Sequence, residues 1–198
     1  MKKQKFIDTK IFSSSVYYIY KNKWVKLFKN IMNNNFEKNN VFNLKKDISN
    51  NIETYNFSDY ITSLSLEILN LQGYDLKNYT LKVNELLLNK FSTTRIFNED
   101  VKLNPNSHIS GYYFLESNDK TPYPLFHDPR PSKAMVQLPQ KNINKVDESS
   151  DKIRFNAIPG SLILFNSYIP CELPRGSSLD SFSFISFNLQ AYSNKFLR

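Results

Sequence analysis

The sequence contains a single cysteine, Cys171, so no disulfide can form within the chain. Histidine is nearly as rare, and the two that occur are His108 and His127. No apolar run approaches the length of a membrane span, and the charged start MKKQKFIDTK is not followed by the apolar segment of a signal peptide. We therefore expect a soluble protein of a reducing compartment that is not secreted by a signal peptide.

Glycine is also scarce: four glycines stand against 12 tyrosines and 16 phenylalanines. This balance indicates a β-rich interior packed with aromatic rings rather than a fold of glycine-rich loops. With 198 residues and 40% hydrophobic residues, the chain is long enough for one sizeable core. We expect a single domain over residues 1–198, in which residues 1–78 are a strand-and-helix portion that packs on the rest.

Acidic residues are outnumbered, because 26 Lys and Arg against 18 Asp and Glu give a net charge of +8. A basic chain favours acidic partners such as nucleic acid, an anionic protein surface or a small di-acid. The lysines, however, are spread among asparagines and form no basic block. Aromatic residues alternate with lysines in YYIYKNKW, as in proteins that bind single strands, but lysine-rich β-proteins have such stretches by chance. Nucleic acid is therefore not an expected partner.

Two segments have the apolar spacing of an amphipathic helix. The first is Trp24–Met32, and the second is Ser58–Leu71. Ser58 has the side chain of an N-cap residue, and Gly73 follows the second segment as a C-cap signal. We expect one short helix and one longer helix before residue 74.

The remaining ordered segments are short, rich in β-branched or aromatic residues, and separated by turn residues. In chain order the expected strands are Lys10–Tyr20, Val41–Leu44, Tyr79–Phe91, a piece within Ser92–Leu103, Ser107–Leu115, Tyr123–His127, Ala134–Leu138, Ile153–Ala157, Ser161–Phe165 and Ser181–Ala191. Pro170–Pro174 is expected to be a corner. Helices early in the chain and many strands after them predict a sheet sandwich or open barrel with helices on one side.

Both histidines lie in one stretch, NPNSHISGYYFLESNDKTPYPLFHDPRP, which runs from Asn104 to Pro131. Strand alternation divides its first part into two faces, with His108, Ser110, Tyr112 and Phe114 on one and Ile109, Gly111, Tyr113 and Leu115 on the other. The closing DPRP ends the strand pairing, because a proline has no backbone N–H to donate.

The motifs NSHISGYYFL and FHDPRP, with IPGSLILFNSYIPCELP and FSFISFNLQAY near the C-terminus, resemble a phage and marine-microbial branch of the Fe(II)/2-oxoglutarate oxygenases. The resemblance covers about Leu81 to Tyr192. It implies a mainly β fold, the double-stranded β-helix (jelly roll), with one or two flanking N-terminal helices. It also implies a site where two histidines and a carboxylate hold Fe(II), and where an arginine or lysine pairs with 2-oxoglutarate.

The sequence departs from the family pattern at the ligand positions. By the resemblance, the two leading histidines fall at Lys102 and Asn104, the distal histidine at Cys171, and the arginine at Phe182 or Ser183. A charged lysine repels a metal dication, and neither phenylalanine nor serine can bind a carboxylate as a cation. Several losses at one site favour a protein that has abandoned the iron chemistry.

The candidates that remain for a residual pocket are Asn104, His108, Asp128, Arg130 and Cys171. For Asp128 and Arg130 we favour a structural role, in which the aspartate caps the turn and the arginine pairs with it. An alternative metal site would use His108, His127 and Asp128, or Cys171 in place of His127. His127 and Asp128 are adjacent, so on a strand they would point to opposite faces, although a turn could bring them together.

Two functions are compatible with this sequence. The first is a non-catalytic, oxygenase-like scaffold (a pseudoenzyme) encoded by a phage, which serves as a structural or assembly component of a virion neck, tail or capsid. Its expected partners are other protein subunits, with no cofactor and no membrane, in the virion or the host cytoplasm. The alternative is an active Fe(II)/2-oxoglutarate-dependent dioxygenase with an atypical ligand set, which would require both Fe(II) and 2-oxoglutarate.

Overall fold

The computed structural model describes residues 7–11, 14–35, 41–47, 51–91, 104, 106–117, 124–130, 138–142, 147, 149–156, 158–173 and 182–194. These residues form ten β-strands in two sheets, two α-helices and one short 3-10 helix. All the strand pairings between them are antiparallel.

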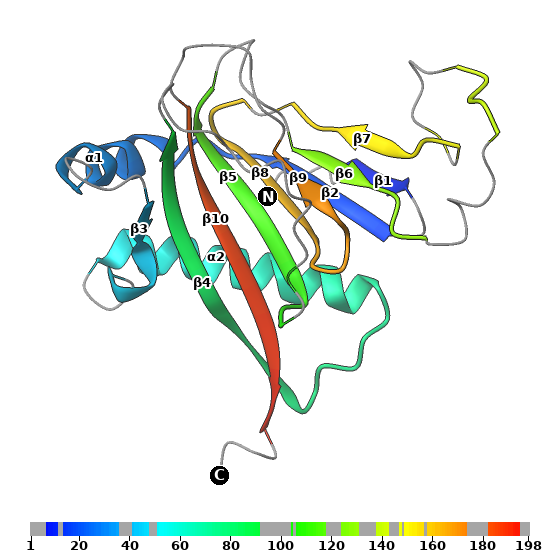
Figure 1. Cartoon of the computed structure of the whole chain (residues 1–198). Helices are drawn as coiled ribbons and strands as arrows, with labels where there is room; N and C mark the ends of the chain where they lie inside the picture. The colour runs from blue at the N-terminus through cyan, green and yellow to red at the C-terminus, as the bar shows by residue number, and fades with distance from the viewer. Residues whose placement is uncertain are drawn as a thin grey trace.

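The larger sheet has seven strands in the order β1-β2-β8-β5-β10-β4-β3 (Figure 1). In that order the strands span Ile7–Ile11, Ser14–Tyr20, Ser161–Asn166, Ile109–Glu116, Phe182–Ser193, Tyr79–Phe91 and Val41–Asn43. The smaller sheet has three strands in the order β7-β6-β9, which span Lys152–Arg154, Leu125–His127 and Cys171–Glu172. Strands far apart in the sequence are therefore neighbours, as β5, β8 and β10 show.

Two helices precede the long strands: α1 (Val25–Asn35) and α2 (Ile52–Leu71). The 3-10 helix η1 (Leu44–Asp47) lies between them in the chain. The helix α2 begins at Asn51, whose Oδ1 accepts hydrogen bonds from the backbone N–H groups of Glu53 (3.0 Å) and Thr54 (3.3 Å). No helix among the described residues is long and apolar enough to cross a membrane.

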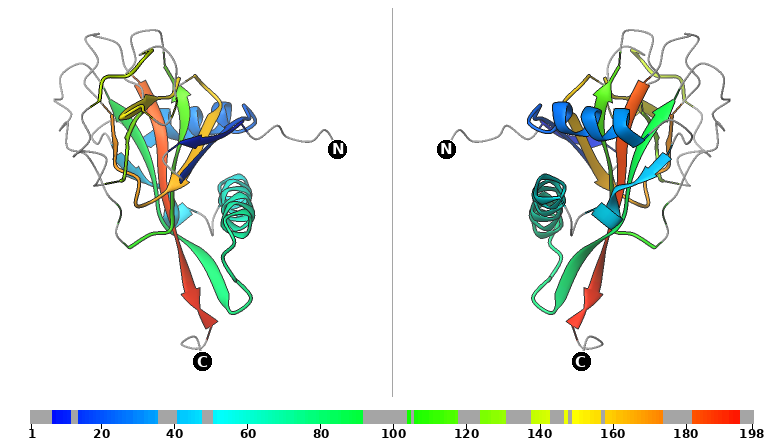
Figure 2. Two further views of the ribbon diagram at one scale, coloured as in Figure 1. Left: turned by 90° about the vertical axis from the view of Figure 1, so that its right-hand side faces the viewer. Right: turned by 90° about the vertical axis from the view of Figure 1, so that its left-hand side faces the viewer.

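The larger sheet is covered on both faces, as the side views show (Figure 2). Both helices pack on one face, where Phe28 of α1 and Phe57 of α2 contact Tyr113 of β5. The smaller sheet packs on the opposite face, where Phe126 of β6 lies against Phe165 of β8. All six side chains of β8 are buried, as expected of a strand covered on both sides.

The strand β5 lies at the centre of this arrangement, between β8 and β10. Its residues alternate between the two cores: Ile109, Tyr113 and Leu115 face the helices, whereas Tyr112 and Phe114 face the smaller sheet. Gly111 is the tightest point, because a Cβ atom there would lie 2.3 Å from Phe187 Cζ and 2.5 Å from the Ile163 carbonyl oxygen. The alternation predicted for this strand is confirmed.

The fold predicted from the sequence is confirmed: the chain is mainly β and has the layers of a jelly roll with two flanking helices. The predicted strand Tyr79–Phe91 has the same bounds in the structure. The predicted N-terminus of the longer helix was wrong, because α2 begins six residues before Ser58 and is capped by Asn51.

Other corrections concern short strands. The segment Lys10–Tyr20, predicted as one strand, is divided between β1 and β2, which pair as a hairpin. The segment Pro170–Pro174, predicted as a corner, contains the two-residue strand β9, Cys171–Glu172. This strand pairs with β6. The strand predicted at Ile153–Ala157 is β7, which ends at Arg154. The strand predicted within Ser92–Leu103 lies outside the described residues, as does the strand predicted at Ala134–Leu138 except for its last residue, Leu138, which is exposed and belongs to no strand.

Candidate functional site

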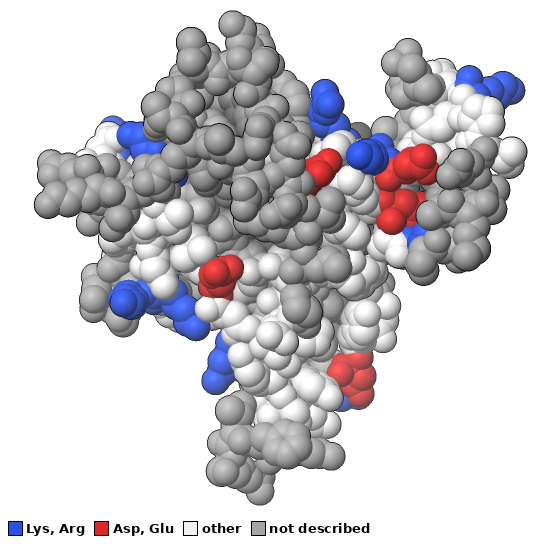
Figure 3. Space-filling view, viewed as in Figure 1, with Lys and Arg blue, Asp and Glu red and all other residues white. Residues whose placement is uncertain are grey.

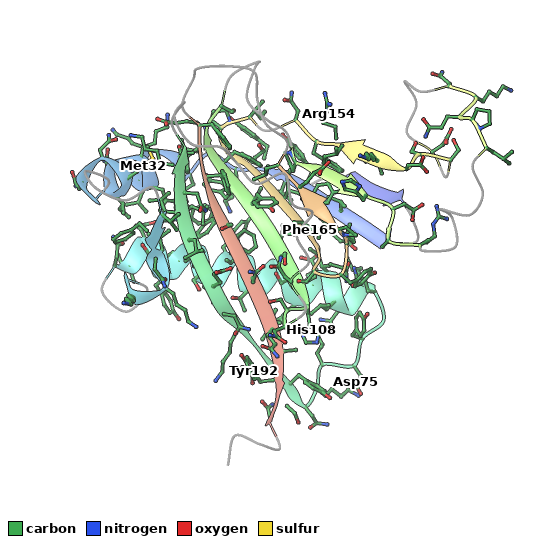
Figure 4. The ribbon with its side chains drawn as sticks, viewed as in Figure 1. Met32, Asp75, His108, Arg154, Phe165 and Tyr192 are labelled. Atoms are coloured by element: carbon green, nitrogen blue, oxygen red, sulfur yellow. The ribbon has the colours of Figure 1, made fainter. Side chains whose placement is uncertain are left out.

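The space between the two sheets is filled by aromatic side chains that surround Cys171. Phe126 of β6 meets Phe165 of β8 with ring centroids 4.8 Å apart, and Phe165 is labelled beside β8 in Figure 4. Phe182 stacks on Phe184 at 5.6 Å, and Tyr112 meets Phe184 edge-on at 5.6 Å. The described part of this interior is therefore a packed aromatic core.

Cys171, at the position where the resemblance puts the distal histidine, lies inside this core with 2% of its surface exposed. It interacts with the hydroxyl of Tyr112 by a side-chain hydrogen bond. Burial, followed by the proximity of Cys171, raises the pKa of Tyr112 well above its usual value near 10. The tyrosine is therefore neutral at physiological pH, and the cysteine has a polar partner in an otherwise apolar place.

The position expected for the 2-oxoglutarate-binding arginine is at the start of β10. Phe182 is 4% exposed and belongs to the aromatic core. Ser183 is fully buried, and its hydroxyl donates to Glu116 Oε2 over 3.2 Å. Neither residue supplies a cation, so this part of β10 has no group that would neutralise a di-acid.

Asp128 is engaged by Arg130 immediately after β6. The Arg130 Nε lies 3.0 Å from Asp128 Oδ1, and its Nη2 lies 2.7 Å from Asp128 Oδ2. The backbone N–H of Arg130 also donates to Asp128 Oδ1 over 2.9 Å. Both carboxylate oxygens thus face the arginine, in the structural arrangement that we favoured from the sequence.

His127 is the last residue of β6, which lies beside β9. Its Nε2 is 3.0 Å from Glu172 Oε1, in a geometry that brings the two groups into contact without aligning a hydrogen bond. Its backbone N–H donates to the Pro170 carbonyl over 2.9 Å. The imidazole therefore faces a carboxylate of the neighbouring strand.

His108 lies just before β5, in the lower part of the molecule near Tyr192 (Figure 4). Its backbone is fixed by two hydrogen bonds. The His108 N–H donates to the Leu189 carbonyl oxygen over 2.8 Å, and the His108 carbonyl oxygen accepts from the Ser167 N–H over 3.0 Å. The side chain is exposed, and its Nδ1 accepts a hydrogen bond of 3.2 Å from the backbone N–H of Ala191.

Asn104 belongs to a polar network centred on the buried Ser110. Asn104 Nδ2 donates to Ser110 Oγ over 3.1 Å, and Ser110 Oγ donates to Asn188 Oδ1 over 2.7 Å. The 2.8 Å contact between the Ser110 and Ser167 hydroxyls completes the set, with Ser167 as donor because a hydroxyl has one proton to give. Asn188 Nδ2 in turn donates to Glu85 Oε2 over 2.6 Å.

The structure does not bring the metal candidates together. Asp128 faces Arg130, His127 faces Glu172, and His108 lies on the far end of β5 beside β10. Among the residues that the structure describes, no group of three His, Cys, Asp or Glu side chains is arranged to hold a metal ion. Lys102 lies outside those residues. The donor set described here therefore does not fit a mononuclear Fe(II) centre.

Several polar residues of this region were not singled out from the sequence. Ser167 and Asn188 belong to the network around Ser110. Gln72, just after α2, exchanges two amide hydrogen bonds with Asn166 at 2.7 and 3.0 Å. Asn166 follows the continuous apolar run of β8, and that contrast was the available signal. Asn188 lies among other polar residues of β10, such as Ser186 and Gln190, so no such contrast distinguishes it.

Charge on the described surface is mixed. On the face shown in Figure 3, the blue Lys and Arg side chains are separated by acidic and uncharged surface. Three ion pairs contain exposed or half-exposed lysine or arginine: Lys23–Glu53, Lys29–Glu116 and Arg130–Asp128. The described part of this face thus carries no continuous basic patch of the kind that tracks a phosphate backbone.

Comparisons with known proteins place the fold. No family model matches the sequence, and no curated protein matches it. Among solved structures, the viral collagen prolyl hydroxylase vCPH from Paramecium Bursaria Chlorella virus-1 is similar with a TM-score of 0.54 and 9% identity, over 90% of each chain. HygX from Streptomyces hygroscopicus, with nickel and 2-oxoglutarate bound, has a TM-score of 0.52 and 9% identity, over 89% of this chain and 82% of HygX.

A prolyl 4-hydroxylase from Phytophthora capsici is similar at a TM-score of 0.52 and 12% identity, over 91% of this chain. The chain spans 59% of that protein, and 57% of a 2OG-Fe(II) oxygenase family oxidoreductase from Burkholderia pseudomallei. At these identities the likeness shows the fold. The fold is that of the 2OG-Fe(II) oxygenases, as the sequence motifs predicted.

Proposed function

We propose that this chain is a non-catalytic protein on the 2OG-Fe(II) oxygenase fold, and that it acts by binding other protein subunits. The observation that carries the proposal is the aromatic core around Cys171. The position that the resemblance assigns to a histidine ligand is a cysteine with 2% exposure, packed among phenylalanines. A metal site needs several converging polar donors and an open coordination position, and a packed apolar core supplies neither.

The contacts of Asp128 support the same conclusion. The carboxylate of Asp128 is held by Arg130 through three side-chain hydrogen bonds at 2.7, 3.0 and 3.1 Å. Removing a carboxylate from such a pair to bind iron would leave the guanidinium without its partner, which costs free energy. The Asp128 carboxylate thus has a structural role that competes with metal binding.

The partner class follows from the resemblance to phage sequences. We propose a structural or assembly role in a virion neck, tail or capsid, with other protein subunits as partners. Mass spectrometry of purified particles of the encoding phage tests this role. We expect the chain at a constant number of copies per particle, and its absence from purified particles would contradict the virion role while leaving the non-catalytic proposal intact.

The alternative function is an active Fe(II)/2-oxoglutarate-dependent dioxygenase. The observation in its favour is the likeness to HygX, a protein of the same fold whose structures contain nickel with 2-oxoglutarate, or iron. In this chain the ligands would be His108, Asp128 and either His127 or Cys171. That set would require Asp128 to leave Arg130 and the start of β5 to move toward β6.

Anaerobic calorimetry with Fe(II), with and without 2-oxoglutarate, distinguishes the two functions. We expect no saturable heat at millimolar Fe(II), and no change when 2-oxoglutarate is added. Tight binding that is lost in His108→Ala, and retained in a control at an exposed position such as Tyr55→Ala, would overturn the proposal and support the dioxygenase.

A further inference from the structure

The larger sheet ends at β1 (Ile7–Ile11) on one side and at β3 (Val41–Asn43) on the other (Figure 1). In the described part of the chain, β1 pairs with β2 alone, so no described strand lies beside its outer edge. The backbone N–H and C=O groups along such an edge can extend the hydrogen-bonded ladder to a further strand. The outer edge of β1 is therefore a surface on which another strand can add.

The position of this edge is fixed by β2. On one side β2 pairs with all five residues of β1, and on the other side it pairs with β8. Val16 and Tyr17 of β2 are 3% and 4% exposed, and they belong to the two cores on opposite faces of the sheet. An incoming strand therefore meets an edge that is already extended, which lowers the conformational entropy lost on binding.

The sequence of β1, IDTKI, is symmetric in character about its middle residue, Thr9. Two antiparallel copies that pair with Thr9 opposite Thr9 place Asp8 of each copy opposite Lys10 of the other. Opposite charges directly across a strand pair are stabilising. The same register places Ile7 of each copy opposite Ile11 of the other, and β-branched apolar residues suit a paired strand. The strand is thus complementary to itself.

The register centred on Thr9 is the one that the charges favour. Only alternate residues of a strand direct their N–H and C=O groups to a given edge, so two copies that use the same edge can shift only in steps of two residues. A shift of two residues places Asp8 opposite Asp8, or Lys10 opposite Lys10. Like charges directly opposite each other are destabilising. Parallel pairing in register brings the same like charges together.

The charged and apolar pairs fall on different faces of the sheet. Thr9 is opposite Val16, which belongs to the core on the side of the smaller sheet. Asp8 is opposite Tyr17, which belongs to the core on the side of the helices. Because residues that alternate along a strand share a face, the isoleucine positions fall on the side of the smaller sheet and the charged positions on the side of the helices.

We propose that β1 pairs antiparallel with β1 of a second copy of this chain, centred on Thr9, and joins the two larger sheets into one. The contact is isologous, because both copies present the same strand to each other. Five residues per copy are few compared with the roughly 20–30 residues a side of a stable interface, so we expect a dimer that dissociates on dilution. This inference goes beyond the proposed function and does not rest on it, since an active oxygenase would expose the same edge.

Sedimentation velocity of the full chain tests the proposal in buffer with EDTA, from micromolar to millimolar protein. We expect the weight-average mass to rise with concentration from that of one chain toward that of two. Because iron is chelated, this result does not depend on the calorimetric outcome above. A mass of one chain at every concentration would overturn the proposal.

Charge reversal connects the dimer to β1. Asp8→Lys gives a strand with two lysines, and Lys10→Asp gives a strand with two aspartates. In the register centred on Thr9, each variant places like charges opposite each other twice, so we expect its self-association to weaken by roughly tenfold or more. An equimolar mixture of the two variants restores opposite charges at both positions. We expect this mixture to dimerise at least as well as the unmodified chain, which also shows that both variants are folded.

Val41→Lys is the matched control, because it adds a charge to β3 at the other edge of the sheet, where Val41 is 47% exposed. We expect this variant to dimerise like the unmodified chain. Equal dissociation constants for the unmodified chain and both charge variants would overturn the proposal, as would a mixture of the two that associates no better than either alone. Loss of the dimer in Val41→Lys would instead assign the contact to β3.

Discussion

The guanidinium of Arg130 holds both carboxylate oxygens of Asp128, with Nη2 at 2.7 Å from Oδ2 and Nε at 3.0 Å from Oδ1. The Asp128 side chain is only 7% exposed, so water cannot replace the arginine efficiently. The pair lies in the chain segment that follows β6. Asp128 is the one carboxylate that the resemblance keeps near the expected iron site, and it is bound by Arg130.

We expect Arg130→Ala to lower the free energy of unfolding by about 1–3 kcal/mol, because it leaves a largely buried carboxylate without its partner. Arg130→Lys keeps the charge but loses the two-point geometry, so its loss should be smaller. Urea denaturation followed by the fluorescence of Trp24 measures both. A change below about 0.5 kcal/mol for Arg130→Ala would show that this pair contributes little to stability.

The glycine of the HISG motif has a steric explanation in the structure. A Cβ atom at Gly111 would lie 2.3 Å from Phe187 Cζ and 2.5 Å from the carbonyl oxygen of Ile163. We expect Gly111→Ala to destabilise the chain by about 2–4 kcal/mol, because the clash involves backbone and a fully packed ring. Thermal unfolding of the purified variant measures the effect.

Gly73→Ala is the matched control for that substitution. Gly73 has a φ of +89°, but a Cβ there would meet no atom within 4 Å. The control therefore adds only the backbone strain of the left-handed conformation, about 1 kcal/mol. If Gly73→Ala were as harmful as Gly111→Ala, backbone strain rather than crowding in the sheet would be the dominant cost.

The main strands and the sides of the sheet could be predicted because their burial follows a period of two residues. In β5, the alternation from Ile109 to Leu115 assigned each side chain to the correct core. The start of α2 could not be located in the same way. Asn51 lies among many other asparagines, and nothing local distinguishes the one whose side chain meets the first backbone N–H groups of the helix.

The cap itself is testable. We expect Asn51→Ala to lower the free energy of unfolding by about 1 kcal/mol, because two backbone N–H groups lose their acceptor. Ser58→Ala, at the position predicted as the cap, lies inside the helix and should be neutral or slightly stabilising. Chemical denaturation of the two variants measures the difference, and equal losses would contradict the assignment of the N-terminus.

The candidate site was harder to predict than the fold, because its residues meet only through the sheet. The Ser110 hydroxyl lies 2.8 Å from the Ser167 hydroxyl and 2.7 Å from Asn188 Oδ1, although Asn188 is 78 positions away in the sequence. The motifs put Cys171 and Asn104 in one expected metal site. The structure separates them, with Cys171 in the aromatic core and Asn104 in the polar network around Ser110.

Alkaline pH tests the core on the helical side of the sheet. Burial raises the pKa of Tyr113 to about 12, and its hydroxyl donates a 2.7 Å hydrogen bond to the Lys21 carbonyl. A tyrosine in the unfolded chain ionises near 10, so between pH 10 and about 12 the folded state binds more protons than the unfolded state. The contribution of Tyr113 to the free energy of unfolding is therefore fully present below pH 10, and it is lost as the pH rises through this window.

We expect urea midpoints to fall steeply between pH 10 and 11, when unfolding is followed by Trp24 fluorescence. Tyr113→Phe should be less stable at neutral pH, because the Lys21 carbonyl loses its donor, but its midpoint should fall less steeply above pH 10. Tyr112 keeps part of the slope in that variant, since its pKa is also raised by burial. The exposed Tyr55→Phe is the control and should follow the unmodified chain. Parallel curves for Tyr113→Phe and the unmodified chain would mean that the lysines, not the buried tyrosine, set the alkaline limit.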